Sequence, residues 1–433
     1  MKETAQRIFR NTLAAINIPE VLARKMGRRG SQFSAHKTRL DIHDYRDLVA
    51  IAFGKAAFGM ASGLSQILAP DHPINGILVL PSAPKHSLPG WTTFVGGHPV
   101  PNDQSFQAGR AILDRLARCD ERSLIFFLIS GGGSALVEQP LDSTTTLEDF
   151  QKLNSVLVGC GAPIQEINVI RKHLSAIKGG RLAAAAPRSS KVTFAISDVP
   201  AGQESSLASG PTLPDPSTIA DTETIAEQYG LRGKFPSSIR RIFDERKLRE
   251  TPKPHDAAFA RAHFSLLLGE HDLLHAAHHA CEAEGYICIC DTSADTWPLD
   301  KAADHLLALL DSHKKANPHH RVAVLADGEV ISPVTGHGVG GRNLAFVLAC
   351  VPKISGKQIT VLSAGTDGLD GNSPAAGAVA DGDSLSRAGE AGLDPGDFLR
   401  RSDAYNFFAP LGDAITTGPT GNNLSDLRLF LAG

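Results

Sequence analysis

The sequence predicts a two-domain α/β protein built around parallel β-sheet. Short apolar runs alternate with longer segments that repeat apolar residues at helical spacing, which is typical of βαβ units. The short runs are almost purely apolar, as expected when helices cover both faces of a sheet. The chain has 433 residues, more than a single hydrophobic core usually serves, so we expect more than one domain.

The elements follow from these runs in order. The expected strands are 48–53, 76–80, 124–129, 192–196, 264–268, 286–290, 322–325 and 359–362. Helical patterns fill most of the intervals, for example 56–68, 104–116 and 299–310. The first 20 residues are expected to form an amphipathic helix that packs on the fold.

The weakest segment for a packed core is 240–256, which is highly charged and ends in two prolines. We interpret it as the domain junction, giving one domain over 1–250 and a second over 255–433. The Gly- and Asn-rich run 416–427 is expected to hold polar ligand groups or to be a plain loop. It would lead into a last helix, capped by Ser425 or Asn423, that packs back on the first domain.

Composition narrows the class of protein. Hydrophobic residues make up 42 % and charged residues 21 %, and the formal net charge is only -3, so no basic field points to nucleic acid. No apolar run reaches the roughly 20 residues needed to span a bilayer, and the N-terminus has no apolar signal core. The six cysteines form no Cys-x-x-Cys pair, which favours a reducing compartment. We therefore expect a cytoplasmic protein that binds neither nucleic acid nor membrane.

Small and charged residues collect where the expected strands end. In open parallel sheets, ligands bind beyond the carboxyl ends of the strands. The run Ser130, Gly131, Gly132, Gly133, Ser134 follows one strand, and its glycines let the backbone approach a phosphate closely. A tight strand–helix turn is the other interpretation of this run.

Two cationic residues are candidates for catalysis. Lys55 follows a strand and opens a helix, where an ammonium group needs an anionic partner such as a phosphate or a carboxylate. Arg342 follows a glycine loop, GHGVGGRN, and an arginine there is suited to stabilising charge on a phosphoryl group in transfer. The same loop contains Gly-x-Gly-x-x-Gly, but its neighbour Pro333 makes a poor central strand, so a dinucleotide fingerprint is discounted.

Acidic residues supply the remaining functions of a phosphoryl-transfer site. Asp198 and Asp367 stand at strand ends, where a carboxylate can hold a divalent ion or accept a proton from a hydroxyl group. For Asp370 we expect ordinary turn chemistry. We assign Lys178, in the basic segment 170–183, to a phosphate, although that segment is also compatible with one solvated helix face.

Four histidines, His271, His275, His278 and His279, lie at helical spacing. A zinc site is one interpretation, but no His-Glu-x-x-His motif is present, so a solvated helix face is favoured.

These segments together resemble the glycerate 2-kinase family, whose C-terminal region is known as the MOFRL domain. The matching segments are FGKAA at 53–57, GGHPVPN at 96–102, ISGGGSAL at 129–136, VIRKHLSAIKGGRLA at 169–183, ISDVP at 196–200, LASGPTLPDPST at 207–218, GVGGRN at 338–343, SAGTDGLDG at 363–371 and GPTG at 418–421. The resemblance extends over most of the chain.

The resemblance implies an ATP- and Mg²⁺-dependent kinase that converts D-glycerate to 2-phosphoglycerate. It also implies a Rossmann-like N-terminal domain, a smaller α/β C-terminal domain and an active site in the cleft between them. The active-site lysine and arginine of the family match Lys55 and Arg342, and its acidic positions near the phosphates match Asp198, as metal ligand, and Asp367.

The sequence also departs from the family pattern. Ala201, Gly202 and Gln203 intervene where an acidic pair usually follows SDVP, and Leu344-Ala345 replaces the Gln-Glu that usually follows GGRN. Three alternatives therefore stay open: a kinase of another small hydroxy-acid, an NAD(P)H-dependent hydroxypyruvate reductase, and a metabolite-binding protein without catalysis. A homodimer is compatible with the sequence.

Overall fold

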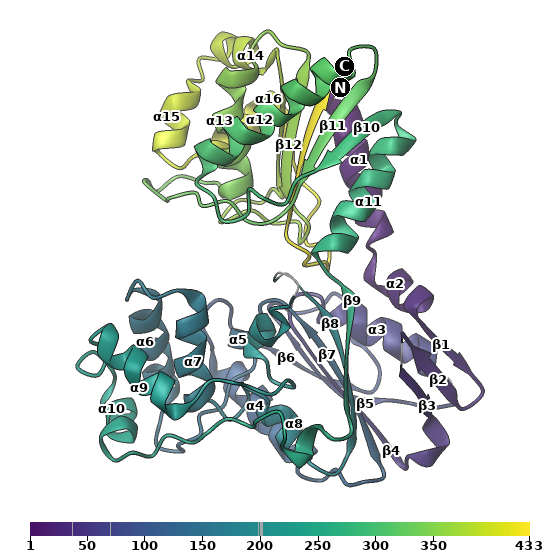
Figure 1. Cartoon of the computed structure of the whole chain (residues 1–433), viewed down its shortest axis with the longest axis vertical. Helices are drawn as coiled ribbons and strands as arrows, with labels where there is room; N and C mark the ends of the chain where they lie inside the picture. The colour runs from purple at the N-terminus through teal and green to yellow at the C-terminus, as the bar shows by residue number, and fades with distance from the viewer. Residues whose placement is uncertain (37, 70, 198, 200–201) are drawn as a thin grey trace. The chain divides into compact units, whose positions relative to one another are not determined.

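The chain divides into two compact units (Figure 1). The computed structural model describes residues 1–36, 38–69, 71–197, 199 and 202–433. The N-terminal unit comprises Ile18–Leu267, and the C-terminal unit combines Met1–Asn17 with Leu268–Gly433. The chain therefore passes from one unit to the other twice, after Asn17 and after Leu267.

This division differs from the expected domains 1–250 and 255–433. The charged segment at 240–256 is not the junction, because α10 (Ser237–Asp244) buries Ile239, Ile242 and Phe243 in a core shared with three other helices. Those helices are α6 (Leu147–Val158), α7 (Ile164–Leu174) and α9 (Ile219–Gln228). Arg240, Arg241 and Asp244 lie on the exposed face of this amphipathic helix and the other charged residues follow it, which is why composition alone suggested a linker.

The N-terminal unit is built on a six-stranded sheet in the order β6-β5-β4-β7-β8-β9. The strands are β4 (Asp47–Phe53), β5 (Asn75–Leu80), β6 (Trp91–Val95), β7 (Ser123–Ser130), β8 (Ser190–Ile196) and β9 (Ala262–Leu268). The pairs from β6 through β8 are parallel. This strand order is that of a doubly wound sheet, so the predicted Rossmann-like fold is confirmed.

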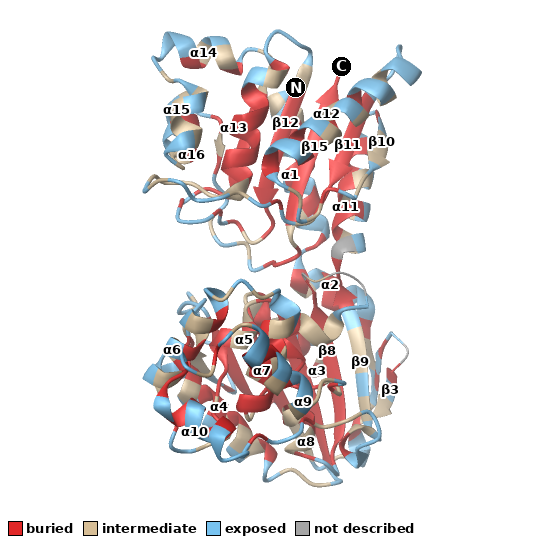
Figure 2. Ribbon diagram, turned by 60° about the vertical axis from the view of Figure 1, so that its left-hand side comes forward, coloured by how far each residue is buried: buried red, intermediate tan, exposed pale blue. Residues whose placement is uncertain are grey.

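Helices and a small sheet cover both faces of this sheet, whose strands are largely buried (Figure 2). Every residue of β7 is buried. On one face, Ile51, Ile125 and Phe127 pack with residues of α4 (Asp103–Leu116). On the other, Phe126 and Phe194 contact Phe33. Phe33 belongs to a small antiparallel sheet of β1 (Met26–Arg29), β2 (Gln32–Ala35) and β3 (Thr38–Asp41). Side chains on both faces of the central strands are buried, so consecutive positions are all apolar. This explains why the strands look purely apolar in sequence.

The C-terminal unit holds a mixed six-stranded sheet in the order β10-β11-β15-β12-β13-β14. The strands are β10 (Tyr286–Cys290), β11 (Arg321–Ala326), β12 (Ile359–Gly365), β13 (Gly377–Asp381), β14 (Ala414–Ile415) and β15 (Asp426–Ala432). Strand β15 is antiparallel to both β11 and β12, which it separates. The carboxyl ends of β11 and β12 therefore lie at the same edge of the sheet.

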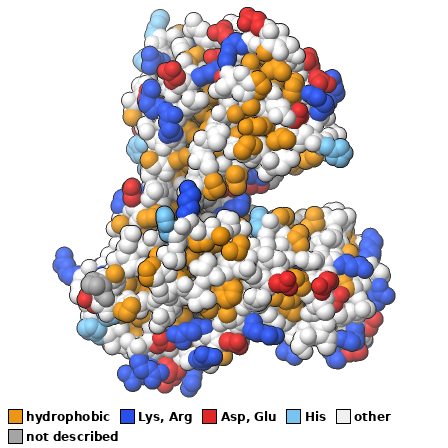
Figure 3. All heavy atoms as spheres, turned by 180° about the vertical axis from the view of Figure 1, so that it is seen from behind, with side chains coloured by type: hydrophobic (Ala, Val, Ile, Leu, Met, Phe, Trp, Pro, Cys, Tyr) orange, Lys and Arg blue, Asp and Glu red, His pale blue; other side chains and the backbone are white. Residues whose placement is uncertain are grey.

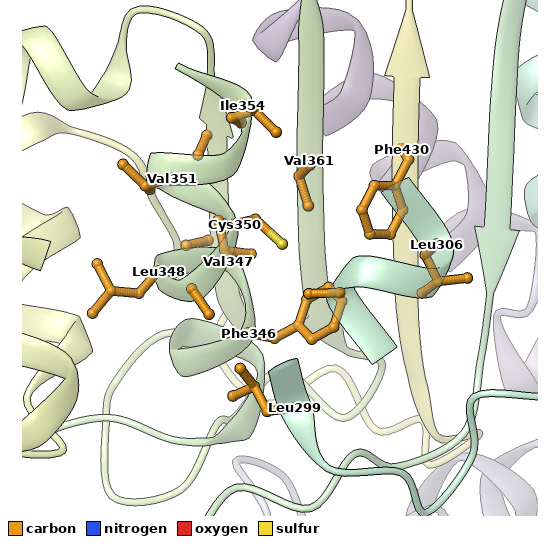
Figure 4. Close-up of a cluster of buried hydrophobic side chains, with 14 of the residues drawn as sticks. Leu299, Leu306, Phe346, Val347, Leu348, Cys350, Val351, Ile354, Val361 and Phe430 are labelled. Atoms are coloured by element: carbon orange, nitrogen blue, oxygen red, sulfur yellow. The ribbon is translucent and has the colours of Figure 1, made fainter. Parts of the chain in front are cut away.

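The expected last helix is wrong, because the chain ends in the central strand β15. All seven of its residues are buried, so alternate side chains pack on both faces of the sheet. Its Phe430 meets Phe346 of α13 (Arg342–Ile354) edge-on, in a core that Leu306 of α12 (Leu299–Ala316) completes (Figure 4). The run is apolar on both faces because helices cover both.

The predicted N-terminal amphipathic helix is confirmed as α1 (Lys2–Ala15), which buries Ala5, Ile8, Phe9 and Thr12. It packs on β12, β13 and β15 and on α11 (Glu270–Ala283), all of them in the C-terminal unit. The two ends of the chain therefore meet in one core.

The surface carries no large field of one charge on the face that Figure 3 shows, where Lys and Arg are interspersed with Asp and Glu. No helix in the described part of the chain is long and apolar enough to cross a bilayer.

Candidate active site

The first group of candidate residues lies where β4 and β7 end. These strands are parallel neighbours at the centre of the sheet. After β4 the chain continues to β5 and β6 on one side, and after β7 it continues to β8 on the other. The point where the winding direction reverses is where doubly wound sheets bind ligands, and Lys55 and the run 130–134 both lie there.

Hydrogen bonds tie these two loops together. The Lys55 amide donates to the Gly131 carbonyl at 3.0 Å, and the Ala56 amide donates to Ser130 Oγ at 2.9 Å. The two loops therefore form one structural unit, and the backbone direction at Lys55 is fixed by the triple-glycine loop.

Gly132 and Gly133 need glycine for different reasons: a Cβ on Gly133 would lie 2.8 Å from Phe53 Cδ2, whereas the constraint on Gly132 is its backbone conformation. Its φ is +82°, in the left-handed region, where a Cβ is strained. A Cβ there would lie 3.2 Å from His98 Cδ2 and 3.4 Å from Lys55 Cγ. Lys55 and His98 thus border the backbone of Gly132, which is half-buried, whereas Gly131 and Gly133 are buried.

A chain of hydrogen bonds supports the loop from behind. Ser134 Oγ and Ser209 Oγ lie 2.9 Å apart, and Ser209 Oγ donates to Asn168 Oδ1 at 3.2 Å. Ser209 and Ala208 both have positive φ, 62° and 49°. Two successive non-glycine residues in this region mark a strained turn, of the kind that clusters at functional sites.

Lys178 lies in the interior of the N-terminal unit, only 2 % exposed. Its ammonium group forms an ion pair with buried Glu138, which also accepts from Ser175 Oγ at 2.5 Å. Burial lowers the pKa of Lys178, and the charge of Glu138 opposes that shift. The side chain is thus committed to an internal pair.

The sequence suggested that 170–183 is one helical segment, but the structure divides it. Helix α7 ends at Leu174, and α8 (Arg181–Ala184) begins after a turn with two left-handed glycines. The side chains that were expected to share a basic face have separate partners. Arg171 donates to Asn154 and Lys172 pairs with Asp215, so no continuous cationic face forms.

The second group of candidate residues lies at the carboxyl edge of the C-terminal sheet, around Arg342. Arg342 is the first residue of α13, and Asp426 is the first residue of β15. Arg342 Nε donates to Asp426 Oδ2 at 2.5 Å, and Nη2 donates to Oδ1 at 3.2 Å and to Glu329 Oε1 at 2.7 Å. Asp426 is 2 % exposed, so its carboxylate is a fixed support.

The electrostatics of this site favour the charged guanidinium. Burial alone would lower the pKa of Arg342, but the charges of Asp426 and Glu329 outweigh burial and raise it. Arg428, two residues after Asp426, is fully buried and donates to the carbonyls of Asp327 and Gly328 at 2.6 and 2.7 Å. Strand β15 therefore supports Arg342 directly and also holds the loop that carries Glu329.

Asp367 joins this group across Gly365. A Cβ on Gly365 would lie 3.1 Å from Asp367 Oδ1 and 3.4 Å from Asp426 Oδ1, so the two carboxylates converge on one side of the glycine. Asp367 is partly exposed, and its Oδ1 accepts from the Leu369 amide at 3.1 Å. Of these two neighbouring carboxylates, Asp367 is therefore the one that solvent and a ligand can reach.

Asp370, expected to serve a turn, also caps a helix. Its carboxylate accepts from the amides of Asn343 at 3.1 Å and Leu344 at 2.8 Å, the first turn of α13. Burial, with the charge of Asp426, raises its pKa to about 6 against the effect of these hydrogen bonds. A Cβ on Gly341 would lie 2.3 Å from Asp370 Oδ1, so the glycines of GVGGRN let the two loops interlock.

Asp198, the expected metal ligand, lies outside the described residues. In the part of the chain that the structure describes, no three or more His, Cys, Asp or Glu side chains are grouped to hold a metal ion. Mg²⁺ does not require such a cage, because it usually takes one or two carboxylates together with substrate phosphates and water. The accessible carboxylate of Asp367 is a hard oxygen donor of that kind.

Comparisons with known proteins cover both units. The model described as a domain of unknown function (DUF4147) matches residues 4–244, and the MOFRL family model matches residues 322–426. The D-glycerate 2-kinase of Thermotoga maritima is 32 % identical, over 89 % of this chain and 90 % of that one. A protein of Agrobacterium vitis named as a hydroxypyruvate reductase is 35 % identical, over 89 % of this chain and 87 % of that one.

The chain belongs to the glycerate 2-kinase family. The crystal structure of glycerate kinase from Thermotoga maritima superimposes with a TM-score of 0.85 at 29 % identity, covering 100 % of this chain and 99 % of that one. The two-unit α/β architecture is thus that of a glycerate kinase.

Within this glycerate 2-kinase fold, the glycine loop before Arg342 is not a dinucleotide turn. Strand β11 ends at Ala326, well before Gly336, so no strand leads directly into the loop. A Cβ on Gly336 would lie 2.3 Å from the Arg401 carbonyl, and one on Gly338 would lie 2.4 Å from Asp403 Cβ. These glycines serve loop packing, and the loop leads into α13 at Arg342, in agreement with the discounted fingerprint.

The structure thus assembles two groups, one in each unit. Lys55 lies with His98 and the loop 130–134, and Arg342 lies with Asp367, Asp426 and Glu329. Of these, Asp426, Glu329 and His98 were not singled out from the sequence. His98 stands in the quoted segment GGHPVPN, which was the available signal, whereas nothing local marks Asp426 as the partner of a residue 84 positions away.

Proposed function

We propose that this chain is a glycerate 2-kinase, which transfers the γ-phosphoryl group of ATP to the 2-hydroxyl of D-glycerate. The observation that carries the proposal is the bare backbone of the triple-glycine loop beside Lys55 at the switch point of the sheet. Likeness to proteins named as glycerate 2-kinases, over 88 % and 89 % of this chain, supports it.

The proposed reaction divides between the two groups of residues. The amides of Gly131–Gly133 bind phosphate oxygens, with Ser130 and Ser134 holding the loop, and Lys55 neutralises charge next to them. Arg342, held by Asp426, stabilises the charge that spreads over the phosphoryl group in the transition state. The proposal requires both groups to act on one ligand.

Asp367 is proposed to accept the proton of the attacking hydroxyl. The glycerate oxygen then forms its bond to phosphorus as the bond to the ADP oxygen breaks, giving 2-phosphoglycerate and ADP. Mg²⁺, held by Asp198 and phosphate oxygens with Asp367 as a further donor, would supply charge neutralisation of the phosphates. Lys178 would bind a phosphate in this scheme after its ion pair with Glu138 opens.

The roles proposed for Asp367 and Arg342 are the same whichever small hydroxy-acid is the acceptor. The departures from the family pattern keep another small hydroxy-acid open as acceptor, and we expect a cytoplasmic enzyme, with a homodimer as one assembly. An ADP-release screen with Mg²⁺ over glycerate, tartronate and threonate, with the product identified by phosphorus NMR, tests the acceptor. If none of these acids gives ADP release, the kinase proposal is contradicted.

A direct test of the chemistry is Arg342→Ala. We expect kcat for glycerate to fall about 10³-fold or more, because an arginine on a transferring phosphoryl group contributes that much in related chemistry. Arg401→Ala is the matched control, since Arg401 is an exposed arginine of the same unit that pairs with Asp397. Wild-type turnover by Arg342→Ala would remove Arg342 from the mechanism.

The reductase named among the relatives is the competing function. It predicts loss of nicotinamide absorbance on incubation with hydroxypyruvate, and no ADP release from ATP and glycerate. The glycine loop packs on its own chain at 401–403, which gives a nicotinamide dinucleotide no βα turn to bind at that loop.

A further inference from the structure

Helix α11 has one buried and one exposed face. Leu273, Ala277 and Cys281 are fully buried against the C-terminal unit. His275 and His279 are exposed on the other side of the helix, with His278 between the two faces. The buried face anchors the helix, so its exposed side chains project from a rigid element.

His275 and His279 are aimed at one another. Their Nε2 atoms lie 3.1 Å apart, and their ring centroids are 4.4 Å apart at an interplanar angle of 81°. Two imidazole nitrogens bound to one zinc ion at about 2.0–2.1 Å in tetrahedral geometry are roughly 3.3 Å apart. The pair is therefore already close to the spacing that a single metal ion requires.

Glu282 supplies a second feature of a metal site. Its Oε2 lies 3.4 Å from Nδ1 of His279, on the opposite side of the ring from Nε2. A carboxylate there favours a proton on Nδ1 and leaves the Nε2 lone pair to ligate, which is how carboxylates orient histidines bound to zinc. The same carboxylate oxygen is 3.5 Å from Nδ1 of His278, so Glu282 serves either ring.

We propose that His275 and His279 bind a divalent late-transition ion of the Zn²⁺ class through their Nε2 atoms, with water completing the coordination. Imidazole suits Zn²⁺, Ni²⁺ and Cu²⁺, whereas Mg²⁺ takes oxygen ligands, so this site is distinct from the proposed catalytic ion. No third protein ligand joins the pair among the described residues, which makes the site open to solvent and readily exchangeable.

The test is a titration of ZnCl2 into the full chain after treatment with EDTA and dialysis, followed by calorimetry. We expect one Zn²⁺ per chain that both His275→Ala and His279→Ala lose. Glu282→Gln should weaken the same binding by about 10- to 100-fold, because it removes the carboxylate that orients the His279 ring. The expected order of affinity is Cu²⁺ above Zn²⁺, with no binding of Mg²⁺ at this site.

Matched controls lie on the same helix and elsewhere. His271→Ala and His278→Ala should keep the ion, and so should Cys290→Ser, which removes the exposed thiol. Arg342→Ala should also bind zinc normally, because the inference is independent of the kinase. A spectroscopic readout is the electron paramagnetic resonance of bound Cu²⁺, which should show coupling to two imidazole nitrogens in the wild type and one in either single variant.

Two results would overturn the proposal. Identical zinc isotherms for wild type, His275→Ala and His279→Ala would mean that the two rings only share a hydrogen bond. Loss of zinc in His271→Ala with retention in His279→Ala would assign the site to a different pair of histidines.

Discussion

Arg342 depends on its buried partner for direction as well as charge. Replacing Asp426 by Asn keeps the shape of the side chain but removes the buried ion pair and leaves Arg342 paired with the exposed Glu329. We expect kcat to fall by about one to two orders of magnitude while KM for glycerate changes less, because the guanidinium is still present but less well oriented.

A double-variant cycle separates orientation from folding. If Asp426 acts through Arg342, the double variant Arg342→Ala, Asp426→Asn should be no slower than Arg342→Ala alone. Multiplicative losses in the double variant would show that Asp426 acts by another route. Asp426→Glu, which retains the charge, should recover part of the lost kcat.

Asp370 predicts a pH dependence of stability. Its pKa is raised to about 6 in the folded protein, chiefly by burial, from an ordinary value of 3.8. The folded state therefore binds a proton that the unfolded state has lost between these values. The corresponding stabilisation is present below about pH 4 and is lost as pH rises to about 6, an effect of roughly 3 kcal/mol from this one group.

Asp370→Asn removes that titration while keeping an acceptor for the helix amides. The difference in unfolding free energy between variant and wild type, measured by urea denaturation at several pH values, should therefore change between pH 4 and 6 and be flat above 7. The variant should be relatively more stable at the higher pH. A difference independent of pH would mean that Asp370 does not titrate in this window.

At the scale of elements, the sequence predicted those whose evidence is local. The strands 48–53, 124–129 and 359–362 are confirmed because continuous apolar runs between glycines and helices carry their own signal. The final strand was mistaken for a loop and helix, because its burial depends on β11 and β12, which are distant in sequence. The break after Leu174 was also missed, since the basic residues there follow helical spacing across it.

The site shows the same division between local and distant signals. Lys55, the triple glycine, Arg342 and Asp367 follow strands or glycine loops, and that position marked them. The residues that hold them in place come from distant segments, as in the contacts of Ser134 with Ser209 and of Arg342 with Asp426. The periodicity of a sequence does not predict such long-range pairs. Burial of Lys178 was hidden for the same reason, because Glu138 is 40 residues away.

The triple-glycine loop yields a prediction with an internal control. Gly132 and Gly161 both have a φ of +82°, but an added Cβ meets His98 and Lys55 at Gly132 and nothing within 4 Å at Gly161. Replacing either glycine by Ala should cost about 1 kcal/mol or more in stability, from the left-handed backbone. Only Gly132→Ala should lower kcat/KM, because only that Cβ intrudes on the candidate phosphate loop.

The measurement compares the two variants in urea denaturation and in the ADP-release assay. Equal losses of stability with unequal losses of activity support the assignment of the loop to phosphate. If Gly161→Ala loses as much activity as Gly132→Ala, the effect comes from general destabilisation and the loop assignment loses its support.

At the scale of the whole molecule, the first helix and the last strand of the sequence both belong to the C-terminal unit. Helix α1 lies in a different unit from the residues that directly follow it, and it packs on the sheet that contains the final strand β15. The C-terminal unit is therefore built from two separate pieces of sequence, whereas the N-terminal unit, Ile18–Leu267, is one continuous piece. The N-terminal unit is inserted between α1 and α11. The C-terminal core is therefore complete only when α1 packs against segments that follow the inserted unit.

Phe9 tests this arrangement, because its side chain is 1 % exposed in the core of the C-terminal unit although it lies near the chain's start. Phe9→Ala should cost about 3–5 kcal/mol, from lost apolar burial and the cavity left behind. Hydrogen exchange should show that protection falls in α11, β12 and β15 while the strands β4 and β7 keep theirs. Arg10→Ala, on the exposed face of the same helix, should leave exchange unchanged. Loss of protection in β4 and β7 instead would mean that α1 stabilises the unit that follows it in sequence, contrary to the division of the chain at Asn17.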